Sequence, residues 1–231
     1  MHTFLVRERR AAAAFLREWA AAEADGGAKG ALLARAEAHA AAAEAVVAAM
    51  TARLWHWEPE AGAAPRRGWW RAFNVKAGAP VGARTYQLAW PAWEGIGAPE
   101  QVAACLAEVL APDLRGAAGI RSTSAADPRY SLEDAIVPYS IWRGPVWVNI
   151  NCCLCYALAR GGRRAEALEV ARGLVDALAA DIRACGAMHE CYNPDTGAPT
   201  CTASKGFLSW NMMAAHLIEN LEAGVDPTAL A

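Results

Sequence analysis

Residues 141–147 read I-W-R-G-P-V-W and residues 189–197 read H-E-C-Y-N-P-D-T-G, and the stretch between these two motifs decides the fold. Pro145 can begin a helix that runs to about Arg160, where Gly161-Gly162 ends it. Apolar residues at helical spacing predict a second helix over residues 163–185. Two helices joined by a short turn and flanked by long loops indicate a helical hairpin.

The same arrangement extends along the rest of the chain. Helical patterns end at Gly or Pro signals, and a long polar loop separates the fourth pattern from the hairpin above. Residues 55–83 are rich in Gly, Pro and Trp, and residues 68–75 could form a β-hairpin there. With about seven helices and long loops at alternate connections, we expect one all-α domain over residues 1–231, built as stacked hairpins of an α/α toroid. The other helices are predicted over residues 3–25, 28–54, 86–93, 99–110 and 207–221, and the loop over residues 116–139.

The bulk composition limits the classes of partner. The 231 residues are 55% hydrophobic and 20% charged, as in a globular protein, and the formal net charge is −2. Such a balance gives no basic surface for nucleic acid or for an anionic membrane. The first ten residues are too highly charged for a signal peptide, and no uncharged span is long enough for a membrane helix. We therefore expect a cytoplasmic protein with small or neutral partners, of unknown oligomeric state.

The seven cysteines form an odd count without regular spacing, so a reduced compartment is expected rather than a disulfide framework. A rival hypothesis is a zinc site. No C-x-x-C pair followed by a matching second pair exists, and C-C-L-C lies in an apolar helix where thiols behave as small hydrophobic groups. We expect no metal and no cofactor. The residues that the zinc hypothesis would use are Cys152, Cys153, Cys155, His189, Cys191 and Cys201.

The first motif has the chemistry of a sugar-binding surface. Trp142 and Trp147 offer flat apolar faces, Arg143 offers a fork of donors, and Asn149 and Asn151 offer amides. Sugar rings present C–H faces edged by hydroxyl groups, which suits this mixture. The alternative is that both tryptophans belong to the core and that the arginine forms a salt bridge.

The second motif offers one carboxylate, Glu190, just before a strong N-P-D-T-G turn signal. A carboxylate held by such a turn can accept a proton from an attacking water as a general base. The alternative is an ordinary surface glutamate next to a turn.

Taken in order, and followed by F-L-S-W at residues 207–210, the motifs resemble the C-terminal part of glycoside hydrolase family 63 and its mannosylglycerate hydrolase-like relatives. The resemblance covers nearly the whole chain and is weak over residues 55–83. It also includes F-L-V-R-E near the start, L-A-W-P-A-W-E-G-I-G at residues 88–97 and the loop at residues 119–131. It implies an incomplete (α/α)6 toroid, with a small irregular or β-hairpin insertion near 55–83.

The resemblance also implies an inverting glycosidase, in which an acid and a base lie about 6.5–9.5 Å apart on opposite faces of the sugar. Glu190 falls on the family's general base. Trp142, Arg143, Trp147, Tyr192 and Trp210 fall on or near its sugar site. The family's acid lies in a W-D-x-S-P-type segment, and no such segment occurs in these 231 residues.

We therefore expect a glycoside hydrolase-like protein, truncated or degenerate, with a general base but no general acid. Its ligand would be an oligosaccharide or a small α-glucoside or α-mannoside. The alternative is a non-catalytic carbohydrate-binding or structural α/α module. The sequence leaves the glycosidic linkage and the sugar specificity open.

Overall fold

A computed structural model describes residues 2–59, 66–133, 142–201 and 204–229. In it the chain separates into two compact units, one built from the helices of the first 55 residues and one from His56–Thr228. The single domain over residues 1–231 stays a prediction. Among the described residues, no helix combines the length and the apolar character needed to span a membrane.

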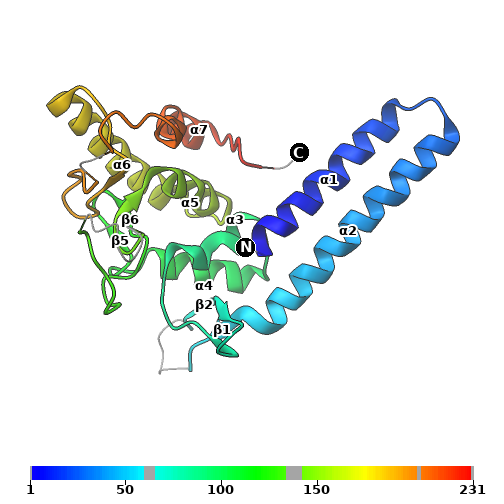
Figure 1. Cartoon of the computed structure of the whole chain (residues 1–231), viewed down its shortest axis with the longest axis horizontal. Coiled ribbons are helices and arrows are strands. Elements are labelled where there is room, and N and C mark those ends of the chain that lie inside the picture. The colour runs from blue at the N-terminus through cyan, green and yellow to red at the C-terminus, as the bar shows by residue number, and fades with distance from the viewer. Residues whose placement is uncertain (1, 60–65, 134–141, 202–203, 230–231) are drawn as a thin grey trace. The chain divides into compact units, whose positions relative to one another are not determined.

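The first unit is a hairpin of two long helices, α1 (His2–Ala22) and α2 (Gly26–Leu54) (Figure 1). Both were predicted, but the Gly-Gly pair begins α2 and does not terminate α1. The reason is Asp25, which caps α2: its Oδ1 accepts hydrogen bonds from the backbone N–H groups of Gly27 at 2.7 Å and Ala28 at 3.2 Å.

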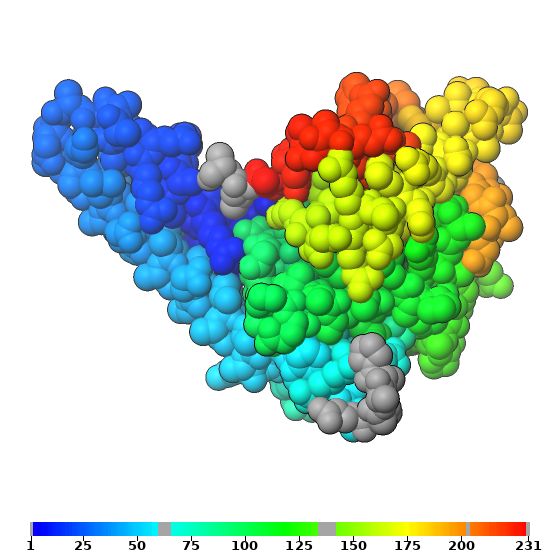
Figure 2. All heavy atoms as spheres, turned by 180° about the vertical axis from the view of Figure 1, so that it is seen from behind, coloured from blue at the N-terminus to red at the C-terminus, as the bar shows by residue number. Residues whose placement is uncertain are grey.

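Leucine and alanine side chains hold this hairpin together. Leu16 and Ala20 of α1 pack with Leu32 and Ala36 of α2 in a buried cluster. In the space-filling view the two helices lie against each other along the hairpin (Figure 2). The alanine-rich composition therefore serves close helix packing, because a methyl group keeps the helix axes near each other.

The second unit has its core around α5 (Val148–Arg160), which packs against α6 (Arg164–Cys185), against α3 (Trp90–Trp93) and against the final helical turns. The C-C-L-C segment lies inside this core, where Cys152, Leu154 and Cys155 are fully buried. The remaining helical elements of the described part are η1 (Tyr86–Ala89), α4 (Pro99–Val109), η3 (Trp210–Ala214) and α7 (Leu217–Ala223).

Four two-stranded sheets complete the described structure, all built from very short strands. Two of them form the predicted insertion near residues 55–83. The predicted hairpin over 68–75 is wrong in its pairing, because residues 68–70 pair with 55–57 and residues 73–74 pair with 79–80. The pairs are β1 (Trp55–Trp57) with β2 (Gly68–Trp70), β3 (Phe73–Asn74) with β4 (Ala79–Pro80), β5 (Arg115–Gly116) with β6 (Gly119–Ile120), and β7 (Val146–Trp147) with β8 (Cys191–Tyr192).

Two helix boundaries differ from the prediction. The helix expected to begin at Pro145 begins at Val148, because β7 occupies the two residues between them. The single helix expected over residues 207–221 is divided into η3 and α7. The division falls at His216, whose backbone (φ −119°, ψ 17°) is not helical.

The insertion is tied to α4 through a buried carboxylate. Glu108 is 4% exposed, and its two oxygens accept hydrogen bonds from Arg67 at 2.6 and 2.8 Å and from Arg84 at 2.6 Å. Arg84 also reaches Asp113 at 2.7 Å. A buried carboxylate is stable only with such partners, so this network fixes the insertion on the helix beside it.

Candidate functional site

The strands β7 and β8 join the two motifs that the sequence singled out. They pair antiparallel, with Val146 opposite Tyr192 and Trp147 opposite Cys191. Trp147, the second tryptophan of W-R-G-P-V-W, is thus brought beside Cys191, the residue that follows Glu190. Residue 141, the first of that motif, lies outside the described residues.

The loop at residues 119–131 is held by the same motif. Arg121 forms a β-bridge with Val146, and the Ser122 backbone N–H donates to the Pro145 carbonyl at 3.2 Å. In return, the Gly144 N–H donates to the Ser122 hydroxyl at 2.8 Å. Three segments far apart in the sequence therefore share one hydrogen-bonded framework.

Asn151 belongs to this framework and not to a sugar-binding surface, which corrects the prediction made for it. Its side chain is fully buried on α5. Its Oδ1 accepts from the Ile120 N–H at 2.7 Å, and its Nδ2 donates to the carbonyls of Ile120 at 3.1 Å and Trp147 at 3.0 Å. Gly119 approaches so closely that an added Cβ would lie 2.8 Å from Oδ1.

Three of the predicted site residues, Trp142, Trp147 and Trp210, form what we call the aromatic group. The rings of Trp142 and Trp147 are stacked, with centroids 3.6 Å apart and planes 3° apart, and Trp210 lies 6.2 Å from Trp147. Trp147 is only 2% exposed, whereas the other two are partly exposed. Trp147 is therefore the buried support of the group, and Trp142 and Trp210 are its accessible members.

Several donors of this region are buried without an acceptor. Within the described part of the chain, Nε1 of Trp147, Nε1 of Trp210 and Nε of Arg143 have no hydrogen-bond partner. Buried donors normally find a partner, and exceptions often mark a place where a ligand or water supplies one. The three N–H groups belong to the W-R-G-P-V-W and F-L-S-W motifs. They can donate hydrogen bonds to oxygen acceptors such as hydroxyl groups.

Glu190 immediately precedes β8 and is partly exposed. Its backbone N–H donates to the Ser204 hydroxyl at 2.9 Å, and the Asn211 side chain donates to the carbonyl of the preceding residue, His189, at 2.7 Å. Two hydrogen bonds, one at Glu190 and one at His189, thus hold the backbone of the segment that carries the carboxylate. A fixed backbone limits the positions that the side chain can reach.

Tyr192, the sixth predicted site residue, is fully buried. Its hydroxyl donates to Oδ2 of Asp181 at 2.9 Å, and burial, together with this carboxylate, raises its pKa. The side chain is therefore enclosed in the interior of the second unit. A contact between Tyr192 and sugar stays a prediction.

Metal-ligand atoms come together at one place in the described residues, formed by Asp181, Cys185 and His189, whose ligand atoms lie within 4.8 Å of one another. Of these, only His189 belongs to the zinc hypothesis drawn from the sequence. Burial raises the pKa of the Cys152 thiol to about 12 and that of Cys155 well above its usual value. Thiols that stay protonated are poor metal ligands.

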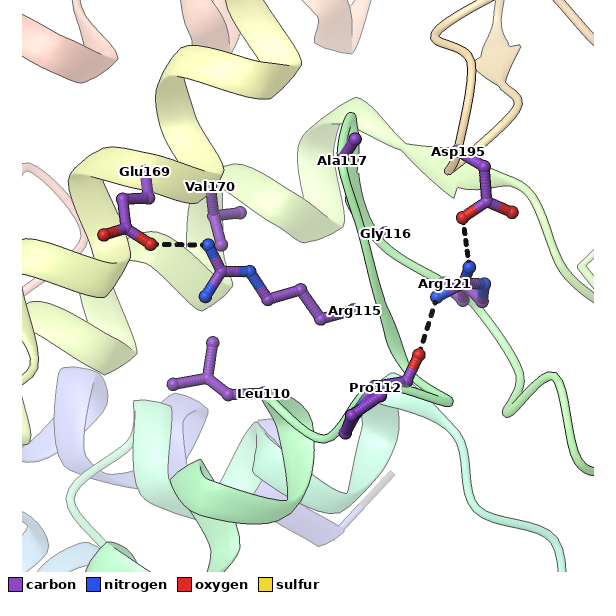
Figure 3. A pocket seen from close by; sticks show the side chains of 9 residues that line it. All are labelled: Leu110, Pro112, Arg115, Gly116, Ala117, Arg121, Glu169, Val170 and Asp195. Carbon is purple, nitrogen blue, oxygen red and sulfur yellow. Dashed lines mark hydrogen bonds and ion pairs between the residues drawn. The ribbon is translucent and has the colours of Figure 1, made fainter.

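A cavity of about 430 Å³ opens on another part of the second unit (Figure 3). Two ion pairs line it: Arg115 with Glu169 at 2.6 Å, and Arg121 with Asp195 of the N-P-D-T-G turn. Its positive and negative groups are paired, which argues against an anion site. The lining includes none of the six predicted site residues and consists of Leu110, Pro112, Arg115, Gly116, Ala117, Arg121, Glu169, Val170 and Asp195.

The sequence reasoning missed the residues that hold the Glu190 segment, namely Asp181, Ser204 and Asn211. Asp181 stands among the apolar positions of a predicted helix, at a place where the 3.6-residue period points inward. That placement was the one available signal, since a charged side chain is almost never fully buried unless it is paired.

Comparison with known proteins identifies the family. The family model for the mannosylglycerate hydrolase MGH1-like glycoside hydrolase domain matches residues 2–210. A search of the curated proteins returns no match.

Solved structures with the same fold include a conserved protein from Thermus thermophilus (22% identity, TM-score 0.60) and the family 63 mannosylglycerate hydrolase of the same organism in complex with glucose (23%, 0.58). Neutral trehalase Nth1 from Saccharomyces cerevisiae is similar as well (15%, 0.56). The matches cover 95%, 95% and 83% of this chain, but only 46%, 44% and 33% of theirs, so the chain spans less than half their length.

These similarities confirm the predicted all-α fold, which is part of an (α/α)6 toroid with small antiparallel hairpins. The family match extends from α1 to Trp210 and includes every motif discussed above. The chain therefore belongs to the mannosylglycerate hydrolase MGH1-like family of glycoside hydrolases.

Proposed function

We propose that this chain carries the general-base side of an inverting α-glycosidase site, with Glu190 as the base. The observation that supports this most strongly is the pairing of β7 with β8, which places Trp147 opposite Cys191. Trp147 of the aromatic group thus lies on the strand that pairs with β8, and Glu190 immediately precedes β8. We propose that a sugar held against the aromatic group has its reacting carbon near the Glu190 carboxylate.

In the proposed reaction, the Glu190 carboxylate accepts a proton from a water molecule as the water oxygen attacks the anomeric carbon. The bond from that carbon to the leaving group breaks with its electron pair on the leaving group, and the configuration at the anomeric carbon is inverted. General-base assistance of this kind is worth about 10²–10⁴-fold in rate.

For sugar binding we propose the partly exposed members of the aromatic group, Trp142 and Trp210, together with Arg143. The indole faces suit the C–H face of a pyranose, and the unpaired N–H groups of Arg143 and Trp210 suit its hydroxyl oxygens. Trp147 supports Trp142 from behind through the stacked pair. We propose that Tyr192, which is completely buried, supports the segment of the base and does not contact the sugar.

The substrate class that we propose is an α-mannoside or α-glucoside of small size. One relative is a mannosylglycerate hydrolase whose structures contain glucose or D-glycerate, and another is a trehalase. We further propose that these 231 residues supply no general acid. Ordinary glycosides, whose leaving oxygen needs a proton, should then react slowly, by about 10²–10⁴-fold relative to a site with both groups.

A glycosyl fluoride tests this proposal directly, because fluoride leaves without being protonated. We expect the chain to hydrolyse α-D-mannosyl or α-D-glucosyl fluoride at a measurable rate and the matching methyl α-glycoside hardly at all. Glu190→Gln should reduce fluoride hydrolysis about 100-fold or more, since the amide cannot accept the proton. A Glu190→Gln variant as fast as the wild type would contradict the assignment.

The second candidate is a carbohydrate-binding module without catalysis. It is favoured by the aromatic group, which needs no carboxylate in order to bind a sugar. In that case Trp142→Ala should abolish the affinity for methyl α-glycosides measured by titration calorimetry, Glu190→Gln should leave it intact, and neither fluoride should be hydrolysed.

A further inference from the structure

Asp181 is a buried carboxylate that the proposed chemistry does not use. It lies one turn before the end of α6, and its side chain is 2% exposed. Its nearest neighbours come from the segment that carries Glu190. The position is unusual, because a charged group so deeply buried destabilises the fold unless several donors surround it.

Four donors surround it. Oδ2 accepts the backbone N–H of His189 at 2.9 Å and the hydroxyl of Tyr192 at 2.9 Å. Nδ1 of the His189 ring lies 2.9 Å from Oδ2 and 3.1 Å from Oδ1, and the Cys185 thiol lies 3.4 Å from Oδ1. Three of the four donors belong to two residues near Glu190: His189, immediately before it, and Tyr192, two positions after it.

The charge of Asp181 follows from these contacts. Burial alone would raise its pKa, but the hydrogen bonds from His189, Tyr192 and Cys185 outweigh burial and hold the pKa below its ordinary value. The carboxylate is therefore ionised at neutral pH and accepts at both oxygens. His189 must then carry a proton on Nδ1 in order to donate, so one charged group fixes a ring, a backbone amide and a phenol together.

The other supports of this segment are neutral. Ser204 accepts from the Glu190 N–H, and Asn211 donates to the His189 carbonyl. Asp181 differs from them in its charge and in the number of donors that it holds. A substitution of Asp181 would therefore loosen His189 and Tyr192 together.

We propose that Asp181 is a positioning residue for the general base, acting on Glu190 through His189 and Tyr192. The inference rests on the proposed role of Glu190. A general base must lie within hydrogen-bond reach of the attacking water, and a displacement of about 1 Å can cost on the order of 10² in rate. The loss of a residue that fixes this position can therefore lower the rate by up to about 100-fold.

The test compares Asp181→Asn with Asp176→Asn, a matched control on the exposed face of the same helix, with α-D-mannosyl and α-D-glucosyl fluoride as probes. We expect Asp181→Asn to lower kcat by up to about 100-fold. KM should stay within about twofold, because the sugar-binding residues are untouched. The control should keep wild-type kcat and KM. A purely structural role would instead reduce the amount of folded protein, which circular dichroism and urea denaturation would show.

Tyr192→Phe covers the case in which Asp181→Asn does not fold, since it removes one hydroxyl from the network and keeps the packed ring. It should lower kcat several-fold at constant KM. A folded Asp181→Asn or Tyr192→Phe variant with wild-type kcat would overturn this inference and leave the role of Glu190 standing. A wild-type chain that hydrolyses neither fluoride would overturn both proposals.

Discussion

At the scale of single residues, the two stacked tryptophans have different roles. Trp147 is buried, so Trp147→Ala should lower the free energy of unfolding by about 3–5 kcal/mol. Trp142 is partly exposed, so Trp142→Ala should cost less stability and should instead remove affinity for methyl α-glycosides. Urea denaturation measures the first effect and titration calorimetry the second. Equal losses of stability in the two variants would contradict this division.

Asn151 offers a second prediction, because its amide satisfies two carbonyls and one N–H in the core. Asn151→Leu keeps a similar volume but leaves these backbone groups without partners. The free energy of unfolding should fall by about 3 kcal/mol or more, at about 1–3 kcal/mol for each unsatisfied group. Asn149→Leu, two residues earlier on the same helix, should change it by less than about 1 kcal/mol. Urea denaturation of both variants is the check.

The pH dependence of stability tests the state of Asp181. Its pKa is lowered in the folded protein, so the folded state binds this proton less readily than the unfolded state does. The stabilisation is complete above the ordinary value of about 3.9 and is lost as the pH falls through the lower folded value. The difference in unfolding free energy between wild type and Asp181→Asn should therefore shrink below about pH 4. A difference that does not change with pH in that range would show that Asp181 is not ionised.

The sequence was informative about residues whose chemistry is visible in a motif. Glu190, Trp142, Arg143, Trp147 and Trp210 each stand in a recognisable pattern, and the structure pairs β7, which ends the first motif, with β8, which follows Glu190. Asp181 could not be assigned, because its role depends on a contact between a helix and a loop several residues away. Asn151 was misassigned for a related reason: an amide suits a sugar and a buried backbone equally well, and only burial distinguishes the two.

At the scale of elements, the network around Glu108 should determine whether the insertion stays on α4. Glu108→Gln removes the charge that Arg67 and Arg84 share. We expect a loss of about 3 kcal/mol in unfolding free energy, at the low end for a broken buried ion pair because Arg67 is half-exposed. Glu100→Gln, on the exposed first turn of the same helix, is the matched control and should have little effect. A loss in the control as large as that in Glu108→Gln would argue against the network.

The long helices were predicted well and the short elements were not. Helices α1, α2, α4 and α6 begin and end within about three residues of their predicted positions, because caps, glycines and apolar periodicity act locally. Strands of two residues have no periodicity of their own. β7 and β8 exist because Val146 and Tyr192 meet across the fold, so neither could be predicted from its own segment.

At the scale of the whole molecule, the described residues combine a hairpin of long helices with a second unit that carries all six predicted site residues. The family match and the solved structures agree on part of an (α/α)6 toroid. In the second unit, the framework of β7, β8 and Asn151 links the aromatic group to the segment of Glu190. We therefore propose that sugar binding and base catalysis reside in one unit of the chain.

Proton NMR of the first sugar that the wild-type chain forms from α-D-mannosyl or α-D-glucosyl fluoride tests this proposal at its centre. Fluoride needs no general acid, so the measurement isolates the base. We expect the β-anomer to appear first and Glu190→Gln to suppress its formation about 100-fold or more. An α-anomer as first product, or β-anomer formed at an undiminished rate by Glu190→Gln, would contradict inverting catalysis by Glu190.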